Sequence, residues 1–228
     1  MDRLGRKISG FTLAEILISL GIIGIVAAMT LPTLFTSIQK RQTVAKLQKA
    51  ISVISQAYKL SNDEVGDVTA EEAKTMGSKE YFKRYWAPYI KVGNYCNTYQ
   101  ECGYNTNSIK TLNLQGGMQI VGRTGVTFST TDGTIYIVRT EVGTIDNTGT
   151  VKTARIAIDI NGPKLPNQMG KDVFLVDRIM ENQGSSIMPL GYNKPNSSID
   201  SNCNSGTGEY CGEKIRRAGW KIDSTYPW

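Results

Sequence analysis

A single carboxylate interrupts the first long apolar run of the chain. Residues 11–35 read FTLAEILISLGIIGIVAAMTLPTLF, and Glu15 is their only formal charge. A carboxylate in apolar surroundings is costly unless it finds a partner, so the position of Glu15 requires an explanation. The chain contains no histidine, which removes the commonest general base and the commonest transition-metal ligand. Because no G-x-S-x-G, H-E-x-x-H or glycine-rich phosphate loop is present either, the sequence disfavours a membrane-tethered hydrolase.

The apolar run is long enough to cross a membrane. At about 1.5 Å per residue, a helix over residues 11–35 covers the roughly 30 Å hydrocarbon core. One alternative is a secretory signal peptide cut after Ala28, because Val26, Ala27 and Ala28 are small enough for a signal peptidase. A charge inside the apolar region argues against it. A second alternative is an uncleaved anchor in which Glu15 snorkels to the interface, but this leaves its position unexplained.

The residues that precede this apolar run and those that begin it carry a recognisable motif. Residues 7–15 read KISGFTLAE, and Arg3 and Arg6 precede them. This pattern of a basic leader, Gly, Phe, T-L-x-E and a long apolar run resembles the processing motif of type IV prepilins and type II secretion pseudopilins. The resemblance covers about residues 5–40 and includes Pro32, which stands where a proline recurs in this helix across the family.

The resemblance implies that chemistry is done to the chain. An inner-membrane prepilin peptidase is expected to cut after Gly10, whose lack of a Cβ lets an enzyme approach the backbone closely. The new amino group of Phe11 is then expected to be N-methylated. This ammonium becomes the expected partner of Glu15, either on a neighbouring subunit or four residues away on one helix face. Both alternatives stay open.

The resemblance also implies an organisation and a location. Residues 1–10 are a cleaved leader, residues 11–36 a transmembrane and filament-core helix, and residues 37–228 an extracytoplasmic head. The implied partners are the prepilin peptidase and N-methyltransferase, copies of the chain, other pilin-like subunits and an inner-membrane assembly platform. The protein first spans the inner membrane once and then enters a periplasmic or cell-surface filament. Pro32 lacks a backbone donor, so a kink or local melting just before it is expected.

The four cysteines fall into two local pairs, Cys96 with Cys102 and Cys203 with Cys211. Their spacings are wider than the C-x-x-C of zinc or thioredoxin-like sites, so disulfides are the better interpretation. Three connectivities are open, and the two local loops are the simplest of them. Disulfides indicate an oxidising compartment outside the cytoplasm.

The remaining patterns predict an α+β fold with a long N-terminal helix packed on an antiparallel sheet. Apolar residues at helical spacing extend the first helix to about Ser61, at Val44, Leu47, Ile51, Ile54 and Tyr58. Thr69 and Glu72 form a capping-box pattern that predicts a second helix reaching the neighbourhood of Ile90. Strands are predicted over residues 125–130, 134–140, 154–160 and 173–179, the first two joined by a turn at Asp132 and Gly133.

One segment between two predicted strands is rich in oxygen donors. Asp159, Asn161 and Asp172, with backbone carbonyls, could supply part of the six to eight oxygens that Ca²⁺ takes. Major pseudopilins carry calcium in a comparable late loop, although this segment does not match their pattern residue by residue. The alternative is a structural turn capped by Asp and Asn side chains. Calcium is the only cofactor that the sequence suggests.

Two function classes follow from the resemblance. The first is a structural subunit of a type IV pilus or type II secretion pseudopilus, without catalysis of its own. The second is a minor pilin whose head binds DNA or a surface. The net charge of +6 is too modest to predict a nucleic-acid partner. The first helix nevertheless has a basic face with no acid between Thr36 and Asn62, formed by Lys40, Arg41, Lys46, Lys49 and Lys59.

Overall fold

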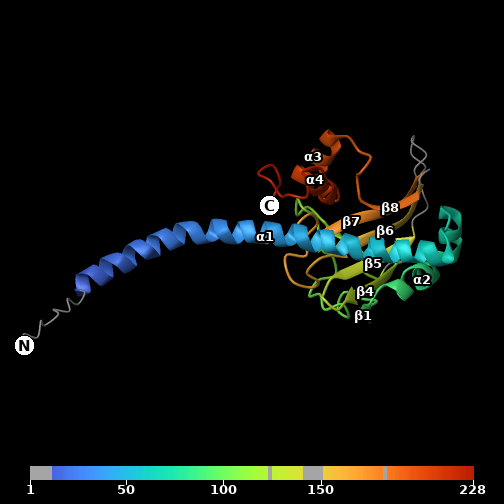
Figure 1. The fold of residues 1–228 in the computed structure, drawn as a ribbon, viewed down its shortest axis with the longest axis horizontal. Helices are drawn as coiled ribbons and strands as arrows, with labels where there is room; N and C mark the ends of the chain where they lie inside the picture. The colour runs from blue at the N-terminus through green and yellow to red at the C-terminus, as the bar shows by residue number, and fades with distance from the viewer. Residues whose placement is uncertain (1–11, 123–124, 141–150, 182–183) are drawn as a thin grey trace, which may run out of the picture. The chain divides into compact units, whose positions relative to one another are not determined.

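The computed structural model describes residues 12–122, 125–140, 151–181 and 184–228 (Figure 1). The chain divides into two compact units, residues 1–40 and residues 41–228. In chain order the elements are α1 (Leu13–Val65), α2 (Ala70–Tyr85), the 3-10 helix η1 (Ala87–Tyr89), β1 (Val92–Tyr95), β2 (Ile109–Lys110), β3 (Gly117–Met118), β4 (Val126–Thr130), β5 (Ile135–Thr140), β6 (Val151–Asp159), β7 (Val173–Glu181), β8 (Gly184–Pro189), α3 (Asn196–Ser205) and α4 (Cys211–Arg217).

In the first unit, α1 continues through Pro32 without interruption. Of the two predicted outcomes, a kink or local melting, local melting is therefore wrong. Threonine hydroxyls bond carbonyls in the turns on both sides, from Thr30 Oγ1 to Val26 O and from Thr36 Oγ1 to Pro32 O, each at 2.9 Å. The donor that Pro32 lacks would bond the Ala28 carbonyl, four residues earlier, so these two hydroxyls bond carbonyls of neighbouring turns and do not replace it.

In the second unit, the rest of α1 supplies one side of the core. Its buried residues recur at helical spacing: Val44, Leu47, Ala50, Ile54, Ala57, Tyr58 and Ser61. The helix ends at Val65, one turn beyond the predicted end, where Gly66 takes a φ of +81°. A left-handed residue just past a helix is a common stop, and glycine adopts it without steric cost. The capping box of α2 is confirmed, because the Thr69 and Glu72 side chains each bond the other's backbone N–H.

The head is built on a six-stranded antiparallel sheet in the order β1-β4-β5-β6-β7-β8. The predicted hairpin is present as β4 and β5, with Gly133 at a φ of +84° in its turn. β6 and β7 confirm the other two predicted strands. The strands β1 and β8 at the two edges were not predicted, and neither was the small β2–β3 pair.

The central strands bury side chains on both faces of the sheet. Along β5, Tyr136 and Val138 join the core shared with α1 and α2, whereas Ile135 and Ile137 join a second core on the opposite face. Successive side chains of a strand point to opposite faces, so a strand with two covered faces reads as a continuous apolar run. The second core is completed by residues of the segment 99–121 and by Leu190.

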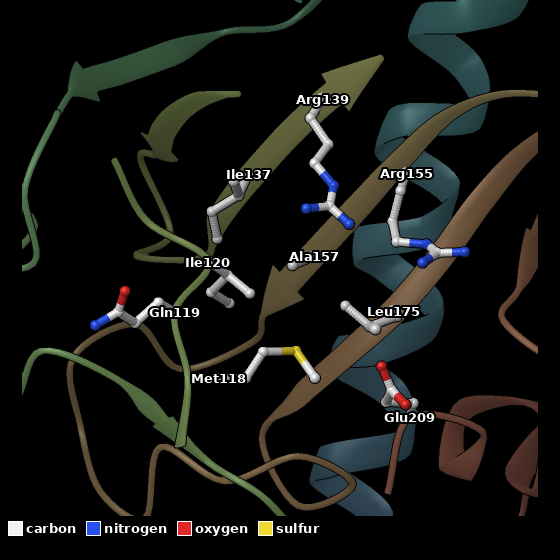
Figure 2. A pocket seen from close by; sticks show the side chains of 9 residues that line it. All are labelled: Met118, Gln119, Ile120, Ile137, Arg139, Arg155, Ala157, Leu175 and Glu209. Carbon is white, nitrogen blue, oxygen red and sulfur yellow. The ribbon is translucent and has the colours of Figure 1, made fainter. Parts of the chain in front are cut away.

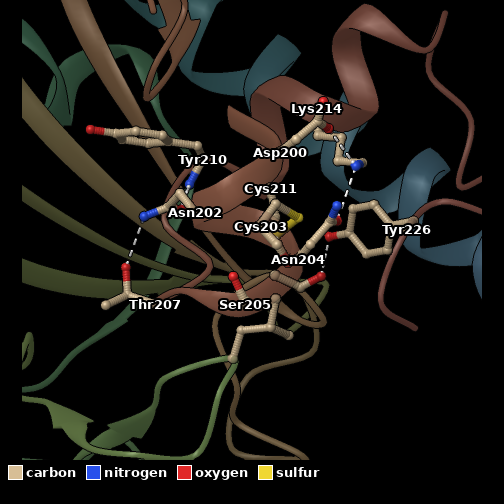
Figure 3. Close-up of a disulfide and its surroundings, with 12 residues drawn as sticks. Asp200, Asn202, Cys203, Asn204, Ser205, Thr207, Tyr210, Cys211, Lys214 and Tyr226 are labelled. Atoms are coloured by element: carbon tan, nitrogen blue, oxygen red, sulfur yellow. Dashed lines mark hydrogen bonds and ion pairs between the residues drawn. A yellow bond between two sulfur atoms is a disulfide. The ribbon is translucent and has the colours of Figure 1, made fainter. Parts of the chain in front are cut away.

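Two short helices, α3 and α4, close the C-terminal part of the head (Figure 3). A disulfide between Cys203 of α3 and Cys211 of α4 joins the two helices, and both cysteines are buried. Gly170 lies against this bridge at a φ of +78°, and a Cβ there would come within 2.8 Å of Cys211 Sγ. Trp220 and Trp228 are half-buried and pack against the main core, so they hold the C-terminal tail onto the head.

Candidate processing motif and assembly helix

Glu15 lies in the first turn of α1 and accepts hydrogen bonds from Thr12. The Thr12 N–H and Oγ1 donate to Glu15 Oε2 at 2.8 and 2.9 Å, and the Glu15 N–H donates to Thr12 Oγ1 at 3.2 Å. This is a capping box, which satisfies backbone donors that a helix start otherwise leaves unpaired. This capping box was not predicted, although Thr12-Leu13-Ala14-Glu15 shows the same T-x-x-E pattern as Thr69 to Glu72.

The apolar side chains of the first unit are exposed around the helix. The large hydrophobic residues from Leu13 to Phe35 are between 43 % and 77 % exposed. The helix is long and apolar enough to cross a membrane, and none of its most apolar stretch is buried. A helix that is apolar on all sides requires a lipid environment or other protein surfaces around it. Glu15 is the one acidic residue that this surface carries.

The residues of the expected cleavage lie outside the described part of the chain. Gly10 and Phe11 are among residues 1–11, so cleavage after Gly10, methylation of Phe11 and its pairing with Glu15 stay predictions. Glu15 and Pro32 are both described, and both lie on the exposed helix.

Fold and helix together define a class of protein. An apolar N-terminal helix with a single carboxylate in its first turn, continuing into the α+β head of a helix on an antiparallel sheet, is the architecture of the pilin-like class. The prokaryotic N-terminal methylation motif matches residues 5–31, so the chain carries the signature of type IV pilin-like precursors. No curated protein and no solved structure matches the chain significantly.

The predicted calcium residues are brought together at the end of β6 and in the loop before β7. Asp159 is fully buried; its Oδ2 accepts a 2.6 Å hydrogen bond from the Tyr104 hydroxyl and its Oδ1 accepts one from the Asn161 N–H. Burial raises the pKa of Asp159 to about 8; the hydrogen bond from Tyr104 opposes this rise, and the Asp172 carboxylate adds to it. Burial also raises the pKa of Asp172.

The hydrogen bonds of Asp172 organise the turn. Its two oxygens accept from the N–H groups of Asn167 and Gln168, at 2.8 and 2.7 Å. The amide oxygens of Asn161 and Asn167 are buried without a hydrogen-bond partner among the described residues. Two carboxylates and two amide oxygens fit Ca²⁺ in part, because the ion takes six to eight oxygens and backbone carbonyls would have to supply the rest. Calcium therefore stays a prediction.

The cysteines pair locally, Cys96 with Cys102 and Cys203 with Cys211. The first pair closes the loop that follows β1, where the Asn97 N–H donates to the Glu101 carboxylate at 2.8 Å. Around the second pair, the Lys214 ammonium contacts the Asp200 carboxylate at 2.6 Å, linking α4 to α3 (Figure 3). Both bridges therefore fix segments that run between or beyond the strands of the sheet.

Proposed function

We propose that the chain is a structural subunit of a type IV pilus or a type II secretion pseudopilus, processed by a prepilin peptidase and assembled through its N-terminal helix. In this proposal residues 1–10 are the leader, residues 11–36 the membrane and filament-core helix, and residues 37–228 the head. The proposal assigns no catalysis to the chain itself.

The observation that carries the proposal is the exposed apolar surface of α1 from Leu13 to Phe35. Lipid covers this surface before assembly, and the same helix of other subunits covers it afterwards. Burying each large apolar side chain is worth roughly 1.5–3 kcal/mol relative to water. A monomer free in water would not gain this free energy of burial. The helix therefore stabilises only a membrane-bound or an assembled state.

Glu15 has a role in both states. In the precursor its carboxylate caps the helix by accepting from Thr12. After cleavage the Phe11 ammonium offers a partner of opposite charge, and the attraction between two unit charges is strong where water is excluded. A carboxylate placed among apolar helices is stable only when such a cation neutralises it. Cleavage therefore links the release of the leader to the pairing that assembly requires.

The expected partners and locations follow from this cycle. The peptidase and methyltransferase act at the inner membrane, and the assembly platform there moves the processed chain into a filament with copies of itself and other pilin-like subunits. The head lies outside the cytoplasm, which is where disulfides such as Cys203–Cys211 persist. The filament then stands in the periplasm or on the cell surface.

The test compares two substitutions in cells that carry the native assembly system. Glu15→Gln removes the charge, whereas Thr12→Val removes the capping hydroxyl and keeps the carboxylate. We expect both chains to be processed, but only Glu15→Gln to lose the ladder of oligomers that chemical cross-linking produces in wild-type cells. Loss of the ladder in both variants would show that Glu15 contributes to assembly only by capping the helix. A ladder that survives in both would contradict the proposed assembly role.

A second candidate is a minor pilin whose head binds DNA through the basic face of α1. Lys46 and Lys59 on this face are exposed, which favours the candidate, but Lys49 pairs with the Asp132 carboxylate at 2.7 Å. Binding through phosphates would weaken steeply as salt rises. DNA binding that is lost with Lys46→Gln and Lys59→Gln together, and that depends on salt in the wild type, would favour this candidate over a purely structural subunit.

A further inference from the structure

Two loops that lie side by side in the head expose large apolar side chains. Leu165 in the loop between β6 and β7 is 77 % exposed, and Leu114 in the turn between β2 and β3 is 66 % exposed. Backbone hydrogen bonds join the two segments, from the Lys110 N–H to the Asn167 carbonyl at 2.9 Å and from the Met169 N–H to the Lys110 carbonyl at 2.8 Å. A single exposed leucine is ordinary on a protein surface, so the meaning of this pair depends on what surrounds it.

Three lysines accompany the two leucines. Lys110 and Lys164 are exposed and Lys171 is half-buried, and no described residue forms an ion pair with any of them. Residues 110–118 and 160–171 include no acid. The two segments therefore present a basic-apolar surface, which consists of Lys110, Leu114, Lys164, Leu165 and Lys171.

The acids nearest to the basic-apolar surface are buried or already engaged. Asp159 and Asp172 stand at the two ends of the loop between β6 and β7, and both are buried. Asp132 pairs with Lys49 at 2.7 Å. Glu101 belongs to the disulfide loop that packs against the loop between β6 and β7, and it accepts a 2.8 Å hydrogen bond from a backbone N–H of its own loop. The outward charge of this surface is therefore positive.

Both leucines are held on ordered segments of the chain. The strand β3 that follows Leu114 leads into Met118 and Ile120, which pack against the second core; Figure 2 shows both side chains pointing toward Leu175 of the sheet. In the loop that carries the other leucine, the two Asp172 oxygens accept from backbone N–H groups at 2.8 and 2.7 Å. The folded head therefore keeps both leucines exposed, because neither segment can turn them into a core.

The basic-apolar surface lies at the end of the sheet where the chain enters the head. The turn between β4 and β5 is fixed there, since Asp132 pairs with Lys49, close to Arg41 at the start of the head unit. The loop between β6 and β7 packs on the same turn: a Cβ on Gly162 would come within 2.6 Å of the Gly133 carbonyl oxygen. Along the chain, this is the end of the head that follows directly on the apolar helix.

We propose that the basic-apolar surface binds the anionic phospholipid surface of the membrane before the chain is assembled. Leu114 and Leu165 enter the boundary between headgroups and acyl chains, and the three lysines contact lipid phosphates. Surfaces that combine apolar and basic side chains bind anionic membranes in this way. The inference rests on the membrane-bound state of α1 in the proposed function. Because α1 already tethers the head to the membrane, this docking is an intramolecular step, and a small surface suffices for it.

The experiment measures how closely leucine methyl groups approach lipid headgroups, by paramagnetic broadening of their NMR signals. The full chain is reconstituted at one copy per nanodisc, in phosphatidylcholine alone or mixed with phosphatidylglycerol, with a trace of lipid that carries gadolinium on its headgroup. Leu114 and Leu165 report on the basic-apolar surface. Leu60, 54 % exposed on α1, is the matched reporter, because the preceding turn of α1 contacts Arg178 toward the far end of β7. Leu34 reports on insertion of the helix.

Two kinds of variant separate charge from apolar contact. Lys110→Gln with Lys164→Gln removes two positive charges, and Leu165→Asn removes an apolar side chain while Leu114 still reports. Lys79→Gln, exposed on α2, and Leu60→Asn are the matched controls. All substituted side chains are exposed, so the fold should be kept.

We expect phosphatidylglycerol to broaden the Leu114 and Leu165 signals and to leave the Leu60 signal sharp. The ratio of docked to undocked head should fall about fivefold for each lysine removed. It should fall about tenfold in Leu165→Asn and stay unchanged in the control variants.

Sharp Leu114 and Leu165 signals in phosphatidylglycerol discs would overturn the proposal, and so would equal broadening with and without this lipid. Equal broadening at Leu60 would show random collisions of the head with the disc and would overturn it as well. Changes at Leu165 that follow the number of chains per disc, and not the lipid, would assign the surface to a second copy. Broadening at Leu34 without Leu165 would overturn docking alone, whereas a sharp Leu34 signal would contradict membrane insertion and with it the proposed function.

Discussion

The Tyr104 hydroxyl donates a 2.6 Å hydrogen bond to Oδ2 of Asp159, and both side chains are buried. The bond joins the segment that follows the Cys96–Cys102 bridge to the end of β6. Buried polar groups of this kind are stable only while every partner is present, because an unsatisfied buried group costs about 1–3 kcal/mol. The pair therefore ties the least regular part of the head to its central sheet.

The raised pKa of Asp159 predicts that the stability of the head falls as pH rises. An unfolded aspartate titrates near pH 3.9, whereas burial raises the pKa of Asp159 in the folded head to about 8. Between these values the folded state holds the extra proton, so the stabilisation is complete below about pH 4 and is lost as pH rises through 8. The hydrogen bond from Tyr104 opposes the rise in the pKa of Asp159, and the Asp172 carboxylate adds to it.

The measurement is denaturant unfolding of the detergent-solubilised chain in a chelator, followed by tryptophan fluorescence, from pH 5 to pH 8. We expect the free energy of unfolding to fall by up to about 1.4 kcal/mol per pH unit. Asp159→Asn keeps an acceptor for Tyr104 but does not titrate, so it should flatten the profile. Asp63→Asn, exposed on α1, is the matched control. A profile as steep in Asp159→Asn as in the control would refute this assignment.

Calcium binding in the same loop is tested at about pH 9, above the pKa of about 8 that burial gives Asp159. If Asp159, Asn161 and Asp172 hold the ion, adding Ca²⁺ raises the unfolding midpoint, because a ligand that binds only the folded state stabilises it. The shift should disappear in Asp172→Asn, and Mg²⁺ should not replace Ca²⁺, since it prefers a rigid octahedral site. An unchanged unfolding midpoint would show that these residues stabilise the turn through hydrogen bonds and do not bind Ca²⁺.

The buried ion pair of Arg178 and Asp67 predicts an asymmetry between its two partners. The Arg178 side chain is fully buried, whereas that of Asp67 is 31 % exposed. Asp67→Ala removes a carboxylate from the fully buried guanidinium of Arg178, which also donates to the Val68 carbonyl and the Tyr58 hydroxyl, and should cost about 3 kcal/mol. Arg178→Met leaves an aspartate that water reaches and should cost less. Urea unfolding of the two variants would measure their losses of unfolding free energy. A larger loss in Arg178→Met than in Asp67→Ala would contradict this prediction.

The two disulfides should contribute unequally to stability. Cys203 and Cys211 are both fully buried, whereas Cys102 is half-buried. Replacing both cysteines of a bridge by alanine costs about 2–4 kcal/mol through the constraint alone. Cavity formation adds to this cost where the sulfurs are buried. Unfolding midpoints should therefore fall further for the Cys203 and Cys211 double variant than for the Cys96 and Cys102 double variant. Equal losses would show that packing around the C-terminal bridge adds nothing.

The sequence predicted those parts of the fold that leave a local pattern. The 3.6-residue period of Val44 to Tyr58, the capping box at Thr69 and the Asp132-Gly133 turn each reflect a local physical constraint, and each is present in the structure. The edge strands β1 and β8 and the helices α3 and α4 have no such signal. α3 reads NSSIDSNCNS, and only Ile199 and Cys203 of it are buried, so its helix depends on tertiary packing.

The processing motif and the charged row on the sheet differ in the same way. The processing motif is contiguous, so its residues are readable from the chain, and the Thr12 cap of Glu15 was readable too. The row of Arg139, Arg155 and Asp177 depends on the register that places these residues opposite one another. Because that register is set by pairing between strands that are 16 residues apart at this point, no local pattern in the sequence shows it.

The most direct test of the proposed pathway is intact mass and N-terminal sequencing of the protein from its native membrane or filament fraction, beside a Gly10→Val variant. The account predicts a mature chain of 218 residues, the 228 of the precursor minus the 10 of the leader, that begins at Phe11 with one added methyl group. Processing should be lost in Gly10→Val, because a branched side chain blocks the approach of the peptidase. A chain that begins at Met29, or one that keeps its leader, would contradict the assembly of this protein as a pilin-like subunit.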